Sequence, residues 1–453
     1  MGSLGIVGAG IDHGAGAAGV ATAIRLSIVD GRIPVGAKFP SERALSSQLG
    51  ISRGTVVRAL SALRVDGWVT TRHGSGSYAA LPATLKSREA PWTLAALGTE
   101  GIVDLARAVT SAPHDAYLAA VDRACSSLPR LLIGSGLADQ GLPELRELIA
   151  SRYTADGVPT SSSQIVITSG ARAGLELVLR SVHDVRRGIA VETPTFPGTL
   201  ELLRRTSSRL VPIPVVDGHW THVHEVFRSG IADLVHLTPD FHNPTGSLMT
   251  ADARQQCAEL AEAQGVILCV DETQRELNLS DQPVPPPLHG RGVVNLGSMS
   301  KSFWGGSRVG WIRCTPPLAR RLQASPHLSI LTPGPLEQLV AHELMSDGDD
   351  AVRLRVRHLR AQRDLLVATL TRSDAFTFDV PRGGLSLWGR LHRESAAEFC
   401  ARAARKGLAM DPGTIFSVDQ AHAQFTRIPF TAPPAELSII AATLDELLSG
   451  GPV

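Results

Sequence analysis

The chain has 453 residues, a formal net charge of +1, 43% hydrophobic residues and 19% charged residues. These values exclude a disordered chain and predict a soluble globular protein of two or three domains; no apolar run is long enough to cross a bilayer and no signal peptide is recognisable, so a cytoplasmic location is expected. Five scattered cysteines without a C-x-x-C pair argue against a zinc site or a disulfide framework, and no metal is expected.

Residues 18–80 show three short helical patterns and a hairpin pattern, after a glycine-rich stretch, residues 1–17, that is interpreted as a flexible tail. The run "VATAIRLSIVDG" spaces its apolar residues by four, "SERALSSQLG" begins at the capping residue Ser41, and "SRGTVVRALSALRVDG" begins at Ser52. The four-residue turn between the second and third patterns is typical of a helix-turn-helix, and "GWVTTRHGSGSY" alternates like a wing hairpin.

The charge of the chain is unevenly spread, because between residues 20 and 80 eight basic residues minus three acidic residues give +5. In a helix-turn-helix, the third helix enters the major groove with the polar residues near its N-terminus. We therefore expect DNA contacts from the second helix, the third helix and the wing, through Arg43, Ser52, Arg53, Thr55, Arg58, Arg72 and His73. A three-helix unit with a merely solvated basic face is the alternative.

The run from Asp30 to Tyr78 closely resembles the winged helix-turn-helix of GntR-type bacterial regulators, which implies operator DNA as a partner. Residues 81–100 have mixed composition with two prolines and are interpreted as an interdomain linker. From residue 101 onward, apolar runs such as "QIVIT", "GIAVE", "DLVHLT", "VILCV" and "VVNL" alternate with helical stretches. This pattern predicts a large α/β domain, residues 101–453, with a doubly wound, mainly parallel sheet.

Polar or aromatic residues follow each of these runs: Ser169, Gly170, Ala171, Phe196, Asn243, Asp271, Ser298 and Lys301. Because parallel strands present their carboxyl ends at one edge of a sheet, we expect these groups to converge. Singly, each has an ordinary structural explanation as a helix cap or a core residue. Together, a lysine, a carboxylate, a phosphate-cradling turn, an aromatic ring and an amide form the set needed to hold pyridoxal 5′-phosphate (PLP).

Each of these residues receives a predicted role toward PLP. Lys301 is expected to form the aldimine, Asp271 to pair with the pyridine nitrogen, Phe196 to stack on the ring and Asn243 to bind the phenolic oxygen. The phosphate is expected to contact Gly170, Ala171, Ser298 and Arg308, and Ser169 is expected to be a further cofactor-binding residue.

The stretch from about residue 100 to the end resembles the PLP-dependent transferases of fold-type I, with "NPTG" and "SMSKSFWGGSRVGW" as its most specific motifs. The resemblance implies a smaller C-terminal α+β subdomain, about residues 330–453, a homodimer, and a substrate-carboxylate grip by Arg427 in "FTRIPF". A GntR-like unit joined to an aminotransferase-like domain resembles MocR-type transcriptional regulators from end to end. That resemblance implies a PLP-dependent DNA-binding regulator that senses a small amine or amino acid through aldimine exchange at Lys301.

Two tyrosines that such aminotransferases usually carry are missing, because their positions hold Thr273 or Gln274 and Leu137. Their loss disfavours efficient transamination without preventing Schiff-base formation, so little physiological turnover is expected. An active class I/II aminotransferase is the alternative, and a PLP-free dimerisation scaffold is a third reading. The sequence leaves open the operator, the direction of regulation, and whether the effector is an amino acid, an aliphatic amine or PLP itself.

Overall fold

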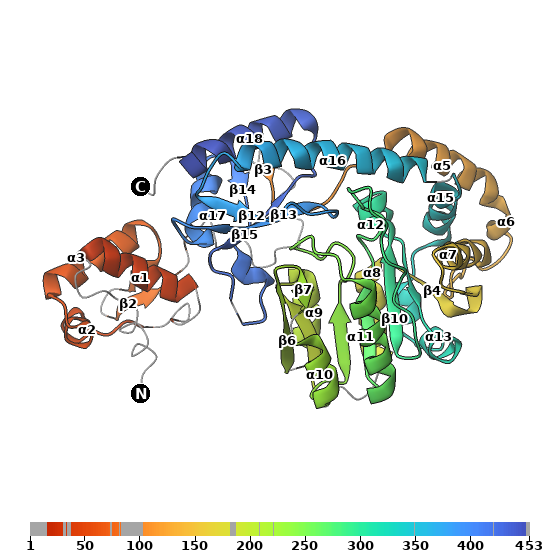
Figure 1. The fold of residues 1–453 in the computed structure, drawn as a ribbon, viewed down its shortest axis with the longest axis horizontal. Helices are drawn as coiled ribbons and strands as arrows, with labels where there is room; N and C mark the ends of the chain where they lie inside the picture. The colour runs from red at the N-terminus through yellow and green to blue at the C-terminus, as the bar shows by residue number, and fades with distance from the viewer. Residues whose placement is uncertain are drawn as a thin grey trace.

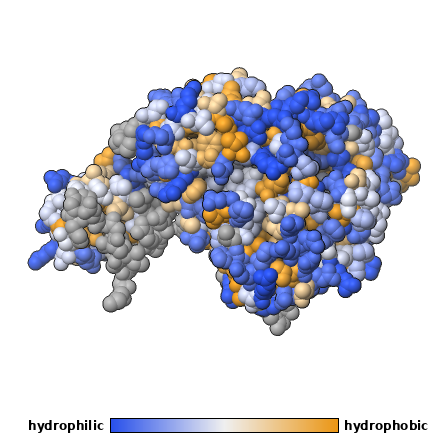
Figure 2. Space-filling view, in the orientation of Figure 1, coloured by the Kyte–Doolittle hydropathy of each residue, from blue (hydrophilic) through white to orange (hydrophobic). Residues whose placement is uncertain are grey.

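The computed structural model describes residues 16–29, 33, 38–72, 75–80, 82, 103–181, 187–207, 209–220, 222–347, 349–419 and 421–449. Most of the predicted tail and linker, and His73, lie outside these residues. Figure 1 shows a small N-terminal unit beside a larger body. Figure 2 shows a mainly hydrophilic face interrupted by apolar patches. Within the described part of the chain, none of the helices combines the length and apolar character needed to cross a membrane.

The N-terminal unit, residues 16–80, has the predicted three helices and hairpin. Its elements are α1 (Ala17–Val29), α2 (Glu42–Leu49), α3 (Arg53–Val65), β1 (Val69–Arg72) and β2 (Gly76–Ala79). The Ser41 and Ser52 hydroxyls accept hydrogen bonds from the backbone N–H groups of Ala44 and Thr55, and these caps fix where α2 and α3 begin. Apolar residues from all three helices form one buried cluster, which stabilises the unit.

One arginine of the third helix hydrogen-bonds to both strands of the wing. The Arg64 guanidinium on α3 donates to Thr71 Oγ1 at 2.9 Å and to Ser77 Oγ at 3.2 Å. Because Thr71 lies on β1 and Ser77 on β2, Arg64 fixes both strands of the hairpin relative to the helix.

The larger body is built on an eight-stranded sheet in the order β4-β11-β10-β9-β8-β5-β6-β7. Its strands are β4 (Ile165–Thr168), β5 (Ile189–Thr193), β6 (Leu210–Val216), β7 (His219–Trp220), β8 (Leu234–Leu237), β9 (Ile267–Asp271), β10 (Val293–Ser298) and β11 (Gly310–Arg313). The strands β10, β9, β8, β5 and β6 pair in parallel, whereas β11 is antiparallel to both of its neighbours and β7 to β6. The predicted mainly parallel sheet is confirmed.

Helices cover both faces of this sheet (Figure 1). Alternate strand residues enter different clusters: Val191 and Leu234 pack in one, and Ala190 and Val235 in another. The helices of the body before the C-terminal region are α5 (His114–Ser127), α6 (Pro129–Leu132), α7 (Pro143–Ala155), η2 (Ser162–Gln164), α8 (Ala171–Ser181), α9 (Pro197–Thr206), α10 (Val223–Ser229), α11 (Ala251–Gln264), α12 (Met299–Ser302), η3 (Gly305–Ser307), α13 (Pro316–Gln323), α14 (Leu328–Leu331) and α15 (Pro335–Ser346).

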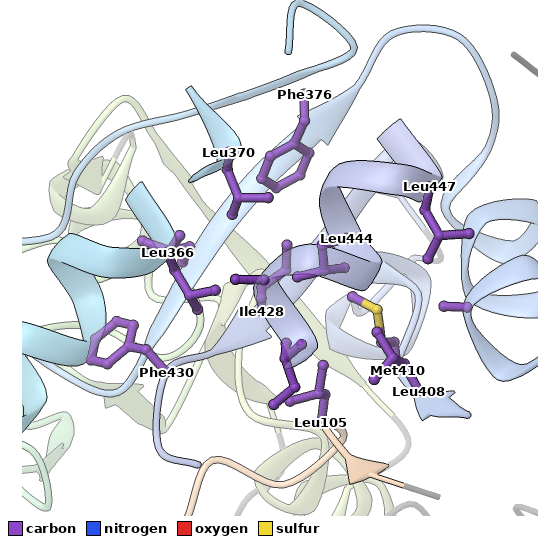
Figure 3. Close-up of a cluster of buried hydrophobic side chains, with 14 of the residues drawn as sticks. Leu105, Leu366, Leu370, Phe376, Leu408, Met410, Ile428, Phe430, Leu444 and Leu447 are labelled. Carbon is purple, nitrogen blue, oxygen red and sulfur yellow. The ribbon is translucent and has the colours of Figure 1, made fainter. Parts of the chain in front are cut away.

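A smaller α+β region at the C-terminus packs beside the sheet. It contains α16 (Asp350–Leu370), β12 (Phe376–Phe378), β13 (Ser386–Leu391), α17 (Ala396–Arg405), β14 (Leu408–Ala409), η4 (Gly413–Phe416), β15 (Phe425–Pro429) and α18 (Pro434–Ser449). The strands β12, β13 and β15 form an antiparallel sheet, and β14 pairs in parallel with β3 (Val103–Asp104). Figure 3 shows the apolar core of this region, which Leu105 joins from the first described part of the larger body.

Candidate functional site

A cavity of about 370 Å³ lies at the edge where the parallel strands end. Its volume is in the range of small-molecule sites, about 300–1,000 Å³. All of the residues that the sequence analysis assigns to cofactor or substrate line it: Ser169, Gly170, Ala171, Phe196, Asn243, Asp271, Ser298, Lys301, Arg308 and Arg427. The predicted convergence is confirmed, while the individual roles stay predictions.

The turn between β4 and α8 has the geometry of an anion cradle. Gly170 has a φ of +94°, which favours glycine, and α8 begins at the next residue, with its N-terminus at the cavity. A Cβ at Gly310 on β11 would lie 2.6 Å from the Gly170 Cα, so the close approach of this strand to the turn also requires glycine. Ser298, at the start of α12, accepts from the Ser300 N–H at 3.2 Å. Arg308 is exposed at the rim.

Lys301 lies on α12, and its Nζ donates to the Ala108 carbonyl at 2.9 Å. Burial lowers the pKa of Lys301 to about 8, with a further contribution from the Arg427 charge, and Asp271 opposes this shift. Lys301 therefore carries a larger neutral fraction near pH 7 than an ordinary lysine, as a nucleophilic amine requires.

Asp271 is the last residue of the central strand β9, and its Oδ1 accepts from the Thr273 N–H at 2.9 Å. The adjacent strand β8 contributes His236 to the cavity wall, a residue that the sequence analysis missed. His236 is almost fully buried, and neither of its ring nitrogens has a hydrogen-bond partner in the described part of the chain. Burial lowers the pKa of His236. Its only sequence signal was one polar residue inside the apolar run "DLVHLT".

Arg427 reaches the cavity from β15 in the C-terminal region. Its guanidinium donates to Asn243 Oδ1 at 3.2 Å and to the Ala106 carbonyl, and it lies over the Phe416 ring at 4.8 Å. Burial lowers the pKa of Arg427 to about 10, although the Asp411 and Asp104 carboxylates oppose the shift. The Arg427 Nε is buried and has no hydrogen-bond partner among the described residues.

The rest of the cavity wall includes the Phe196 ring, Thr273 and Gln274. Thr273 and Gln274 are the two candidate positions of the missing tyrosine that would follow Asp271. Phe196 caps α9, and a Cβ at Gly198 would lie 2.5 Å from its ring, so Phe196 folds back over its own helix. Thr273 and Gln274 line the cavity, whereas Leu137, at the second tyrosine position, is 77% exposed. Four further wall residues were not predicted from the sequence: Arg107, Arg172, Thr199 and Thr238.

Five of the predicted DNA-binding residues are exposed on the N-terminal unit, and a sixth, Thr55, is half-buried. The side chains of Arg43, Arg53, Arg58 and Arg72 are exposed. Arg53 lies 3.3 Å from the Glu42 carboxylate, and Arg72 stacks over the Tyr78 ring at 4.9 Å. These contacts leave the cationic face open to solvent, as phosphate contacts require.

Ser52 and Thr55 have a second task in the same region. The Ser52 hydroxyl accepts from the Thr55 N–H at 3.1 Å and lies 2.8 Å from the Thr55 hydroxyl. Both side chains therefore stabilise the start of α3, whether or not they also contact DNA.

In the described residues, no group of three or more His, Cys, Asp or Glu residues is placed to hold a metal ion.

Comparisons with known proteins match both parts of the chain. The family model described as aminotransferase class I and II matches residues 135–444, and that of bacterial regulatory proteins of the gntR family matches residues 17–78. The pyridoxine biosynthesis transcriptional regulator PdxR of Corynebacterium glutamicum is 32% identical, covering 74% of each chain. The probable rhizopine catabolism regulatory protein MocR of Rhizobium meliloti is 26% identical, covering 86% of this chain and 84% of its own.

Solved structures match the larger body. The α-aminoadipate aminotransferase LysN of Thermus thermophilus superimposes with a TM-score of 0.70 at 23% identity, covering 78% of this chain and 93% of LysN. A kynurenine aminotransferase of Pyrococcus horikoshii gives a TM-score of 0.71 at 22% identity, covering 77% and 91%. These likenesses show the fold. The chain belongs to the aminotransferase class I and II family and, with its gntR-type N-terminal unit, is a PLP-dependent DNA-binding transcriptional regulator of the MocR type.

Proposed function

We propose that this regulator senses a small amine or amino acid through exchange at Lys301. The observation that carries the proposal is the half-buried Lys301 amine, which has a pKa lowered to about 8 and shares one cavity with Asp271 and Arg427. When bound, PLP supplies an aldehyde that condenses reversibly with primary amines. A cavity in which a free amine can replace the Lys301 amine on PLP would respond to the presence of that free amine.

The residues around the cavity fit PLP group by group. The Gly170 turn, the N-terminus of α8, Ser169, Ser298 and Arg308 would hold the phosphate. Asp271 would pair with the pyridine nitrogen, Phe196 would stack on the ring and Asn243 would bind the phenolic oxygen. Arg427 would bind the carboxylate of an amino-acid effector, because its buried guanidinium lines the cavity.

The N-terminal unit would contact operator DNA through the predicted residues of α2, α3 and the wing. A homodimer would place two such units on two half-sites. Leu132, Ile133 and Leu137 support this assembly, because three large apolar side chains are 71%, 89% and 77% exposed within one short stretch of a single chain.

The test measures binding of the purified, PLP-loaded chain to DNA from its own promoter region at moderate salt, while amines and amino acids are added one at a time. We expect one amine to change both the visible spectrum and the DNA affinity without catalytic consumption. The proposal is contradicted if the chain does not bind this DNA. It is also contradicted if no amine that changes the spectrum changes the DNA affinity.

An active class I/II aminotransferase is the second candidate, and the buried Arg427 beside Lys301 favours it. Gln274 counts against it, because a glutamine amide at that position of the wall cannot tune the cofactor as a phenol does. Conversion of an amino acid with a 2-oxo acid at an ordinary enzyme rate, about 1 s⁻¹ or faster, would establish turnover.

A further inference from the structure

Residues 103–110, here called the strap, join the cavity to the C-terminal region. At one end, the Val103 and Leu105 N–H groups donate to the Gly407 and Ala409 carbonyls, each at 2.8 Å. The Leu105 side chain is 2% exposed and lies in the same core as Leu408 (Figure 3). This end of the strap is therefore fixed to β14.

The other end of the strap is held by the two cavity cations. The Lys301 Nζ donates to the Ala108 carbonyl, and the Arg427 guanidinium donates to the Ala106 carbonyl. These are the two cations that PLP and an amino-acid effector engage in the proposed function, on which the present inference rests. A molecule that takes the Lys301 Nζ donor or the Arg427 Nη2 donor competes with the strap for it.

The strap shares its apolar core with the helix that precedes β14. Helix α17 buries Phe399, Cys400 and Ala403 in the cluster that contains Leu105. Its first residue, Ala396, donates to the Ala423 carbonyl at 2.8 Å, only a few residues before Arg427 in the chain. A shift of the strap or of β15 therefore bears directly on α17.

The start of α17 holds the N-terminal unit. Ala397 is 3% exposed and belongs to the buried cluster of α1, α2 and α3. Glu398 pairs with Arg25 of α1, and these side chains are 16% and 23% exposed. The second Glu398 oxygen accepts from the Ser395 N–H and hydroxyl, both at 2.9 Å, so the same carboxylate caps α17 and binds α1.

We propose that the strap and α17 carry the occupancy of the cavity to the DNA-binding unit. With the cavity cations bound to Ala106 and Ala108, the strap is anchored at both ends and α17 holds α1. An occupant that takes the Lys301 Nζ donor releases the Ala108 anchor, and one that also takes the Arg427 Nη2 donor releases Ala106. The proposed states with an empty and with an occupied cavity differ in their contacts at the cavity and at α1. Coupling between distant sites requires such a difference at both sites.

The first experiment is amide hydrogen exchange on the full chain, without PLP and with PLP as the probe. We expect PLP to speed exchange at the Val103 and Leu105 amides about tenfold, because a hydrogen bond to a charged donor contributes about that factor or more. We expect PLP also to change the amide exchange rates where α1 contacts α17, and to leave the exchange rates in α11 unchanged. Unchanged or slower exchange in the strap overturns the proposal.

The second experiment breaks the contact with α1 and spares the cavity. Arg25→Ala removes one partner, and Glu398→Gln removes the charge but keeps a side chain that can complete the cap of α17. Arg372→Ala is the matched control, because Arg372 pairs with Asp445 on the surface of the same C-terminal region. PLP absorbance and the strap response are expected to match wild type in all three.

The result to compare is the ratio of DNA affinities with and without PLP. We expect this ratio to fall to about one in Arg25→Ala and Glu398→Gln, and to stay at the wild-type value in Arg372→Ala. A wild-type ratio of one, or a wild-type response retained in both single variants, overturns the route. If amines still alter DNA affinity in these variants, the route alone fails and the proposed sensing function stands.

Discussion

The N-terminal unit and the cavity both depend on cations, but they place them in opposite surroundings. Arg43, Arg58 and Arg72 are exposed, whereas Arg427 is buried and Lys301 is half-buried. An exposed cation keeps its hydration and acts on a polyanion by displacing counterions, so its effect depends on salt. A buried cation has lost its hydration, so its pKa falls and it binds one small partner through strong hydrogen bonds. Substitutions at the exposed and at the buried cations are expected to have different effects for this reason.

The largest expected effect is that of Lys301→Ala. Without the amine, the chain has no nucleophile for the PLP aldehyde, so we expect complete loss of the visible absorbance of lysine-bound PLP and of every response to amines. Exposed Lys406, which pairs with Glu446, provides the control Lys406→Ala, expected to match wild type. Retention of the absorbance band in Lys301→Ala would place the cofactor attachment elsewhere.

Arg427→Lys keeps the charge but loses the planar fork of donors. We expect the chain to bind amino-acid effectors about 10- to 100-fold more weakly, the range set by hydrogen bonds to charged groups, while a carboxylate-free amine binds as before. Titration of the PLP absorbance with paired ligands, an amino acid and its decarboxylated amine, measures both. Equal losses for the two ligands would show that Arg427 has a structural role only.

The capture of PLP should depend on pH through Lys301. Its pKa in the folded chain is about 8, and only the neutral amine attacks an aldehyde. The capture rate is therefore expected to rise about tenfold per pH unit below that value and to level off above it. Stopped-flow absorbance from pH 6 to 9 tests this, and a rise that continues beyond pH 9 would mean that burial does not lower the pKa.

The strand ends and helix caps could be predicted from the sequence, whereas the buried contacts of the cavity could not. The strand ends were predictable because apolar runs reveal parallel strands, and parallel strands share an edge. The caps at Ser41 and Ser52 were predictable because capping is local. His236 was hidden because strand alternation does not say which polar residue faces a cavity. The bonds from Lys301 to Ala108 and from Arg427 to Ala106 join residues 193 and 321 apart in the chain, and no local pattern encodes such contacts.

On the exposed side of the comparison, Arg58→Ala should weaken DNA binding about fivefold to tenfold and reduce the salt dependence of the binding constant by about one phosphate contact. Arg291→Ala is the control, because the Arg291 side chain is 86% exposed on the larger body. Binding measured over a range of salt concentrations distinguishes the two variants. An unchanged salt slope in Arg58→Ala would remove this arginine from the DNA-binding surface.

The smallest expected effect separates two tasks at the start of α3. Ser52→Ala removes the hydrogen bond to the Thr55 N–H and should lower the free energy of unfolding of the N-terminal unit by about 1 kcal/mol. Ser52→Asp restores the cap but places a negative charge where DNA phosphates approach. If Ser52 lies at the DNA, Ser52→Asp recovers thermal stability and loses DNA affinity. If both properties recover together, Ser52 acts only as a cap, and the exposed arginines alone provide the contacts with DNA at this end of the helix.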